Sequence, residues 1–322
     1  MKDPLISVVI PTRKRPELVV RAVRSALGQT IDALEVIVVV DGCCDATKEV
    51  LESINDSRLR LIELRESVGG SEARNVGIRQ AHGDWIALLD DDDAWMAPKL
   101  ELQLDLARKT HAKWFLVSCS LTARTPRADY VWPRRYPDRD EPLCEYLLVR
   151  NSLFRGEGSV QTSTFFGSRK LFEQCAFQPD LKKHQDTDWL LRAAKLPGFQ
   201  VLFVQEPLVL HFIEEERQTV SSAGNWNYSL NWARENRHLF TPRAYSAFIT
   251  NQVAPEAAEI SAWSSIFPLL REAWLHGNTR PREFVHFVGM WMLPRKLRRK
   301  IRDHLSRLQV TNLRNAIAKS EL

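Results

Sequence analysis

The hydrophobic pattern of the first hundred residues alternates between short apolar runs and amphipathic segments. Four runs are short and mostly apolar, which is typical of buried strands: 5–10, 35–40, 59–64 and 85–89. The segments between them repeat apolar residues at helical spacing and predict helices at 16–29, 46–54 (with Asp45 as cap) and 71–81. This alternation predicts an α/β fold with a mostly parallel sheet flanked by helices.

The pattern becomes less regular after Pro98. It predicts, in order, a helix to 109, a strand at 114–118, a loop over 124–142, a helix near 143–150, a strand near 160–166, a helix near 187–195 and a strand near 201–204. From residue 225 onward the pattern is helical, and half of the ten tryptophans lie there. We therefore expect an α/β domain over 1–222 and a helical C-terminal region over 223–322.

Composition narrows the class of protein. Hydrophobic residues at 44% and charged residues at 26% describe an ordinary globular chain. The five cysteines are odd in number and form no CxxC pair, which favours a reducing compartment over a disulfide framework or a cysteine zinc site. No signal-peptide pattern follows Met1, and the late apolar stretch 284–293 falls short of the ~20 residues of a membrane span. We expect a cytoplasmic protein.

The positive charge is concentrated near the C-terminus. Residues 271–322 carry twelve Lys and Arg against four acids, so this tail has a charge of +8 and the remaining chain −3. A helix over 282–293 would place five apolar residues on one face, and a second apolar stripe follows beside the basic run 295–302: Phe284, Phe287, Val288, Trp291 and Met292, then Leu297, Ile301, Leu305 and Leu308. Such a pattern favours peripheral contact with the cytoplasmic face of an anionic membrane. A helical appendage packed on the domain and a dimer interface are the alternatives.

Polar residues follow three of the predicted strands, at the edge where open parallel sheets bind ligands: 11–15, 41–42 and 90–93. The last group is four consecutive aspartates, whose carboxylates would repel one another unless a cation lay among them. Oxygen ligands at this density suit Mg²⁺ or Mn²⁺, although a solvated acidic turn has the same pattern. Asp41 could accept a hydrogen bond from a nucleobase or ribose, or form an Asx turn with Gly42.

Basic residues lie near the same edge. Arg15, with Arg13 and Lys14, could face phosphate groups, and Arg74 with Asn75 could point to the same place from an early helical turn. Solvated surface positions are the alternative for both groups.

Four segments, in this order, resemble the signature of family 2 glycosyltransferases with the Rossmann-like GT-A fold: Val8-Val9-Ile10-Pro11-Thr12, Val38-Val39-Val40-Asp41-Gly42, Ala73-Arg74-Asn75-Val76-Gly77 and Leu88-Leu89-Asp90-Asp91-Asp92-Asp93-Ala94-Trp95. The resemblance is clear over 5–105, fainter over 158–222, and absent from the C-terminal hundred residues. It departs from the family pattern where Val40 replaces an Asp and Cys43-Cys44 replace Gly-Ser.

The resemblance implies roles for matching residues. Thr12 and Asp41 would bind the nucleoside, with Pro11, Arg15 and Arg74 in the same nucleotide-sugar site. Asp92 would hold a Mn²⁺ or Mg²⁺ ion, and Asp90 or Asp91 would reach the ribose and the waters of the metal.

The family also has a general base in its second half, and the matching string is His184-Gln185-Asp186-Thr187-Asp188. Asp186 takes the position of the base, while Gln185 stands where Glu is usual. Asp186 could instead cap the next helix, and Asp188 is a second candidate for the base. His211, after the strand 207–210, is a candidate metal or diphosphate ligand, with a structural role as the alternative. The segment 217–222 could close over the diphosphate or be a plain surface loop.

The sequence thus predicts an inverting glycosyltransferase that uses a nucleotide-diphosphate donor, with UDP favoured, and a hydroxyl of a glycan or lipid-linked acceptor. A nucleotide-sugar-binding protein without catalysis and a nucleotidyltransferase are the alternatives. Nucleic acid is not an expected partner, because the body of the chain is net acidic and has no recognition motif.

Overall fold

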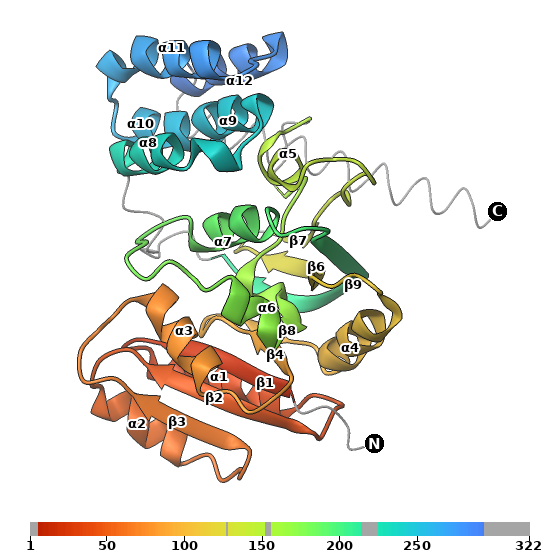
Figure 1. The fold of residues 1–322 in the computed structure, drawn as a ribbon. Coiled ribbons are helices and arrows are strands. Elements are labelled where there is room, and N and C mark those ends of the chain that lie inside the picture. Colours follow the sequence, from red (N-terminus) through yellow and green to blue (C-terminus); the bar gives the residue numbers. More distant parts are fainter. Residues whose placement is uncertain (1–5, 127, 152–155, 214–224, 293–322) are drawn as a thin grey trace, which may run out of the picture. The chain divides into compact units, whose positions relative to one another are not determined.

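The computed structural model describes residues 6–126, 128–151, 156–213 and 225–292 (Figure 1). The chain divides into two compact units, which we describe separately: Met1–Pro137 with Ser159–Ser221, and Asp138–Gly158 with Ser222–Leu322. The predicted closing loop at 217–222 and the basic stripe beyond 293 lie outside the described residues.

The first unit contains a nine-stranded sheet in the order β3-β2-β1-β4-β8-β6-β9-β5, with β7 on β6. Its N-terminal strands pair in parallel, as predicted: β1 (Ile6–Thr12), β2 (Leu34–Val40), β3 (Leu59–Glu63) and β4 (Trp85–Leu88). Every residue of β1 and β2 is buried, because helices cover both faces of this part of the sheet. The predicted α/β fold is confirmed.

The second half of the sheet mixes parallel and antiparallel pairs. It consists of β5 (Ala94–Trp95), β6 (Phe115–Arg124), β7 (Asp129–Trp132), β8 (Phe166–Ser168) and β9 (Gln200–Phe212). β6 pairs with β9 in parallel, while β8 is antiparallel to both β4 and β6. β7 lies in the segment predicted as a loop, where it pairs only with β6, and β9 unites the two short strands predicted near 201–204 and 207–210.

The predicted strand near 160–166 is wrong. A short 3₁₀ turn, Thr162–Thr164, precedes β8, and the side chain of Gln161 accepts a hydrogen bond from the backbone N–H of Ser163. Local side-chain bonds of this kind compete with strand pairing. The turn is therefore polar, and it brings Gln161 and Ser163 to the end of β4.

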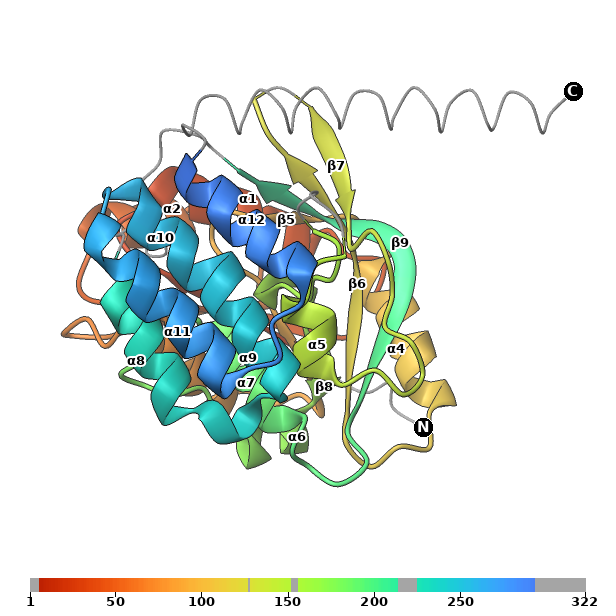
Figure 2. The same ribbon diagram turned by 90° about the horizontal axis from the view of Figure 1, so that it is seen from above.

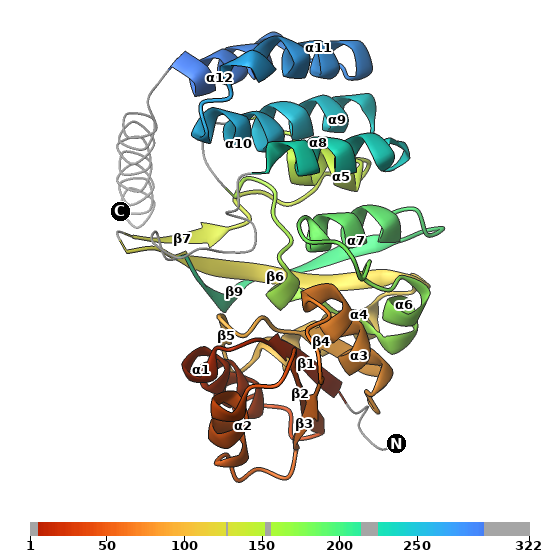
Figure 3. The same cartoon turned by 90° about the vertical axis from the view of Figure 1, so that its left-hand side faces the viewer.

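Helices cover opposite faces of the parallel strands (Figure 3). Helices α1 (Pro16–Leu27) and α4 (Lys99–Lys109) share a core with the alternate residues Val8 and Val36, while α3 (Gly70–Arg79) packs on the other face. Helix α2 (Asp45–Glu52) packs beside α1. Its N-cap is Cys44 rather than the predicted Asp45, which is the first helical residue and places its charge at the positive end of the helix.

Gly77 allows α3 to lie directly on the sheet. A Cβ atom at this position would come within 2.3 Å of Val9 Cγ1 and 3.2 Å of Val39 Cγ2. Only a residue without a side chain fits this approach. Because Arg74 lies one helical turn before Gly77, the close packing also determines where that guanidinium group points.

Aromatic packing positions helix α7 (Gln185–Ala193), which follows α6 (Arg169–Gln174). Trp189 is fully buried and its ring lies 5.1 Å from that of Phe172 and 5.8 Å from that of Phe177, in stacked geometry. Asn75 of α3 holds the chain before α7, because its side chain exchanges two hydrogen bonds with the backbone of Phe177. Asn75 is therefore structural, whereas its neighbour Arg74 points elsewhere.

The second unit is helical over its described residues (Figure 2). It contains α5 (Leu143–Leu148), α8 (Trp226–Glu235), α9 (Pro242–Phe248), a π-helical turn at Ile249–Val253, α10 (Ala254–Glu259), α11 (Ile266–His276) and α12 (Pro281–Met292). Trp232 and Phe248 pack in its interior. No helix in the described part of the chain combines the length and apolar character that crossing a bilayer requires.

The apolar face predicted for residues 282–293 is split by the packing of α12. Phe287 and Trp291 are buried in the helical unit, whereas Phe284, Val288 and Met292 are exposed. Phe287 and Trp291 lie one helical turn apart, on the side of α12 that contacts α10 and the π-helical turn. The predicted apolar stripe is wider than this contact, so its other residues remain exposed.

Candidate active site

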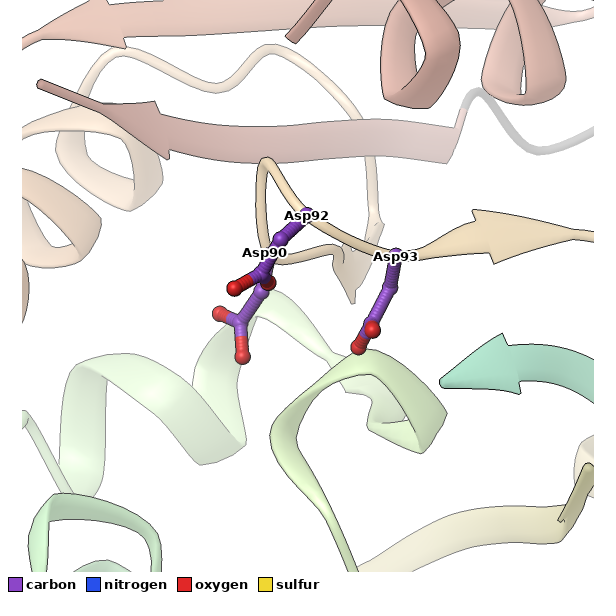
Figure 4. A group of neighbouring side chains, drawn as sticks. All are labelled: Asp90, Asp92 and Asp93. Carbon is purple, nitrogen blue, oxygen red and sulfur yellow. The ribbon is translucent and has the colours of Figure 1, made fainter. Parts of the chain in front are cut away.

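The four aspartates follow β4 and lie at the carboxyl edge of the parallel strands. Asp90, Asp92 and Asp93 each offer a carboxylate oxygen, and these oxygens lie within 4.8 Å of one another (Figure 4). No other group of three potential metal ligands occurs in the segments that the structure describes. Each aspartate has a different set of neighbours, and Asp91 and Asp93 are buried, so the run is not a freely solvated turn.

Asp91 joins the end of β1 to the aspartate run. Its carboxylate accepts hydrogen bonds from Thr12 Oγ1 at 2.8 Å and from Arg15 Nη1 at 2.9 Å. Burial raises the pKa of Asp91, although the charge of Arg15 and the two hydrogen bonds oppose this effect. Arg15 also lies 3.6 Å from Asp92, so one guanidinium group serves two carboxylates.

Asp90 joins the run to helices α3 and α7. Arg74 donates one hydrogen bond to Asp90 Oδ1 at 2.5 Å and another to Gln185 Oε1 at 2.9 Å. Gln185 therefore fills the place of the usual Glu with an oxygen that accepts from the same arginine. The amide oxygen makes this contact without adding a negative charge.

Asp93 is fully buried and joins the run to β9. Its Oδ2 accepts from Gln161 Nε2 at 3.0 Å and Ser163 Oγ at 2.6 Å, and its Oδ1 lies 2.9 Å from His211 Nδ1. An ionised carboxylate only accepts hydrogen bonds, so Nδ1 of His211 carries the proton. A neutral His211 then keeps the lone pair of Nε2 for a metal, whereas a protonated His211 could donate an Nε2–H hydrogen bond to a diphosphate.

The aspartates also determine the protonation of His211. Burial alone would lower its pKa, but the hydrogen bond to Asp93 and the charges of Asp93, Asp92 and Asp90 raise it above the ordinary value. A divalent cation among the same carboxylates would reverse this effect. The donor set of carboxylate oxygens and one imidazole nitrogen suits Mn²⁺ or Mg²⁺.

Asp41 holds the loop that leads into α3. Its carboxylate accepts hydrogen bonds from Ser67 Oγ, from Val68 N–H at 2.6 Å and from Gly69 N–H. Oδ1 accepts one of these hydrogen bonds and Oδ2 the other two, and the side chain is buried. Asp41 connects to the rest of the site through this loop, because the next residue, Gly70, lies beside Arg74 and Gln185.

Asp186 lies in the first turn of α7, beside the aspartate run. Burial raises the pKa of its carboxyl and the charge of Asp90 raises it further, while a hydrogen bond from the backbone of Thr187 and the charge of Arg74 act in the opposite direction. The N-cap of α7 is His184, so Asp186 does not have the capping position that was the alternative.

The structure therefore separates the predicted residues into two groups. Asp91 contacts Thr12 and Arg15, Arg15 also contacts Asp92, Arg74 contacts Asp90, and His211 contacts Asp93. Gln161 links Asp90 to Asp93, Asp186 is within electrostatic reach of Asp90, and Asp41 holds the loop that leads to Arg74. Arg13 and Lys14 are exposed, Pro11 is buried within β1, and Asp188 forms an ion pair with Arg192 of its own helix at 2.7 Å. Gln161 and Ser163 were missed, because the polar run 161–164 was assigned to a strand.

Comparisons with known proteins agree with this geometry. The family model described as Glycosyl transferase family 2 matches residues 7–175. The chain is 29% identical over 259 residues to the amylovoran biosynthesis glycosyltransferase AmsB of Erwinia amylovora, which covers 76% of this chain and 84% of that protein.

Two solved structures are similar in fold. Mannosyltransferase PcManGT from Pyrobaculum calidifontis, in complex with GDP-Man and Mn²⁺, has a TM-score of 0.57 at 18% identity, covering 97% of this chain and 87% of that one. TarS 1–349 of S. aureus, in complex with UDP-GlcNAc, has a TM-score of 0.52 at 17% identity, covering 88% and 79%. At these identities the likeness concerns the fold, which is the GT-A fold.

Proposed function

This chain belongs to glycosyltransferase family 2, and from that premise we propose that it moves a sugar from a nucleotide-diphosphate donor to an acceptor hydroxyl. The observation that carries the proposal is the contact network around Asp90–Asp93, which brings two arginines, His211 and Asp186 to one edge of the sheet. Cations and hydrogen-bond donors collected there suit a diphosphate, and a carboxyl with a raised pKa suits proton abstraction.

We propose that Asp92 holds Mn²⁺ or Mg²⁺, with His211 as a further ligand. Asp92 is the best candidate because its side chain is one-quarter exposed, whereas three hydrogen bonds occupy the carboxylate of Asp93. The bound ion would neutralise charge on the departing diphosphate. PcManGT, whose structure holds Mn²⁺, supports this assignment. Arg15 and Arg74 hold the carboxylates of Asp91 and Asp90 on either side of Asp92 in the sequence, which would support its position when an ion is bound.

Asp186 is the proposed general base. It would take the proton of the acceptor hydroxyl as the oxygen attacks the anomeric carbon from the face opposite the leaving diphosphate. The new bond to oxygen forms as the bond to the diphosphate breaks, so one displacement inverts the anomeric configuration. A placed base of this kind contributes roughly 10²–10⁴ in rate.

We propose a UDP-sugar as the donor and a glycan or lipid-linked molecule in polysaccharide biosynthesis as the acceptor. AmsB, a relative named for amylovoran biosynthesis, supports the acceptor class, and TarS with UDP-GlcNAc supports the nucleotide. PcManGT binds GDP-Man, so GDP-sugars are the donors to compare. Thr12 and Asp41 are the proposed contacts to the nucleoside.

Product analysis separates this function from its alternatives. Incubation with nucleotide sugars, Mn²⁺ and an acceptor should release a nucleoside diphosphate. Pyrophosphate would instead indicate nucleotidyl transfer, and donor binding with neither product would indicate a protein without catalysis. Gln185 does not favour this last alternative, since its amide oxygen accepts from Arg74.

A further inference from the structure

Helices α11 and α12 carry an unusual concentration of exposed apolar side chains. Twelve large hydrophobic residues are exposed in the described part of the chain, and nine of them lie between 260 and 292. The most exposed are Phe267 at 81%, Met292 at 72%, Val285 at 69%, Trp274 at 66% and Leu275 at 60%. Exposed apolar residues scattered singly need no explanation, but a group of this size on one unit indicates a binding surface.

These side chains lie on the outer side of the helical unit. In Figures 1 and 3, α11 and α12 lie in one layer of the helical unit, and α8, α9 and α10 form the layer below it. Leu269 and Ala273 of α11 and Phe287 of α12 are buried toward that inner layer. On the outer side, a shallow groove on α11 is lined by Phe267, Leu270, Arg271, Trp274 and Leu275. We call the exposed side chains of α11 and α12, with this groove, the outer apolar face.

The charges around the outer apolar face are of one sign. Both acids of the two helices are buried: Glu272 accepts hydrogen bonds from Arg234 and Tyr245, and Glu283 accepts from the backbone N–H of Arg280. Arg271 and Arg280 are exposed. The described surface of this region therefore presents aromatic and aliphatic groups together with cations, and its acids are turned inward.

We propose that the outer apolar face binds the surface of an anionic lipid bilayer. Tryptophan and phenylalanine side chains insert at the boundary between headgroups and acyl chains, and arginines beside them pair with anionic headgroups. The basic run that follows Met292 in the sequence has the same sign of charge. This inference stands independently of the proposed function, because it uses no residue of the catalytic unit.

A second copy of the chain is the other occupant that an apolar face of this size could have. In a two-fold dimer the same patch meets itself, so the exposed arginines of both copies would lie in one interface. The described residues of α11 and α12 offer no exposed acid to compensate these like charges, which disfavours that arrangement. A bilayer with anionic headgroups supplies the missing negative charge.

Vesicle flotation of the full chain, without donor or metal, tests the inference. Wild-type protein should float with vesicles of phosphatidylcholine and phosphatidylglycerol, and less with phosphatidylcholine alone. The double variant Phe267→Glu with Trp274→Glu should lower partitioning by about a hundredfold, roughly tenfold for each large apolar contact. Arg271→Ala should lower it by about fivefold, and only with the anionic vesicles.

Matched variants in the first unit serve as controls. Val131→Glu adds the same charge at an exposed apolar residue of β7, and Arg108→Ala removes an exposed arginine of α4, so neither should change flotation. If the double variant melts below wild type, the single variants Phe267→Ser and Trp274→Ser replace it, with the same expected direction. Equal flotation of wild type and these variants overturns the inference. A dimeric wild type that does not float, and that becomes monomeric in the variant, also overturns it in favour of the second copy.

Discussion

Nδ1 of His211 lies 2.9 Å from Oδ1 of Asp93, although 118 residues separate them in the chain. This contact joins β9, in the mixed half of the sheet, to the aspartates that follow β4 in the parallel half. Asp93 is fully buried and its other oxygen accepts from Gln161 and Ser163, so of the three potential ligands we expect it to orient the imidazole ring rather than to bind an ion itself. The position of His211, the proposed metal ligand, thus depends on its hydrogen bond to Asp93.

Asp93→Asn should therefore weaken Mn²⁺ binding without removing a ligand. Loss of such a supporting partner typically costs about 10–100-fold in metal affinity. His211→Ala should have a similar effect, and the double variant should be no weaker than His211→Ala alone, because both changes disable one ligand. Calorimetric titration with Mn²⁺ measures all three. Fully additive losses would show that Asp93 and His211 act separately.

Asp186→Asn should lower transfer by roughly 10²–10⁴ while nucleotide binding stays unchanged. The same variant should melt at a higher temperature than wild type. The folded protein raises the pKa of Asp186, so it binds the proton more tightly than the unfolded chain, and the ionised carboxylate destabilises the fold at neutral pH. A variant with lost transfer and a lowered melting temperature would instead indicate structural damage.

Asp188→Asn is the matched control on the same helix. Asp188 is buried and accepts from Arg192 Nε at 2.7 Å, so its loss should cost about 1–3 kcal/mol of folding free energy. The specific activity of the folded enzyme should stay within about twofold to threefold of wild type, since the ion pair with Arg192 lies within one helix. If Asp188→Asn abolishes transfer and Asp186→Asn does not, their roles are reversed.

The pH dependence of kcat/KM should follow the ionisation of the Asp186 carboxyl, since this ratio depends on the ionisation of groups in the free enzyme. Because burial and Asp90 raise the pKa of Asp186, the base is lost as the pH falls through a value above the ordinary ≈ 3.9 of an aspartate. Rates measured with saturating Mn²⁺ should fall on the acid side with unit slope, while circular dichroism shows the fold intact. A plateau that persists down to the ordinary aspartate range would contradict the assignment.

Gly77→Ala tests the packing that places Arg74. The added methyl would lie 2.3 Å from Val9 Cγ1, so α3 must move away from β1. Overpacking of this kind typically costs 1–3 kcal/mol. The expected result is a lower melting temperature together with reduced transfer, because Arg74 shifts relative to Asp90. Reduced stability with unchanged kcat/KM would show that the contact of Arg74 tolerates the movement.

Local pattern was sufficient to predict the parallel half of the sheet and the residues that follow its strands. Ile6–Thr12 and Leu34–Val40 are mostly apolar and buried on both faces, which is the pattern of central parallel strands, and the carboxyl ends of such strands meet at one edge. Thr12, Arg15 and Asp91 were predicted for the same reason.

The remainder depended on contacts that sequence pattern does not contain. The 3₁₀ turn at Thr162–Thr164 forms because Gln161 caps it, and its site role appears only when β8 pairs beside β4. Likewise, the burial of Phe287 and Trp291 but not Phe284 on α12 depends on where the neighbouring helices lie. Helical periodicity shows an apolar stripe, but not which part of it a neighbour covers.

Binding of nucleoside diphosphates with and without Mn²⁺ tests the central claim most directly, namely that Asp92 holds a cation against the donor's phosphates. Calorimetry on wild type should show UDP binding that depends on Mn²⁺ and disappears with chelator, with GDP as the comparison nucleotide. In Asp92→Ala, binding should become weak and insensitive to the metal. Equal binding by both proteins, unchanged by chelator, would contradict the account.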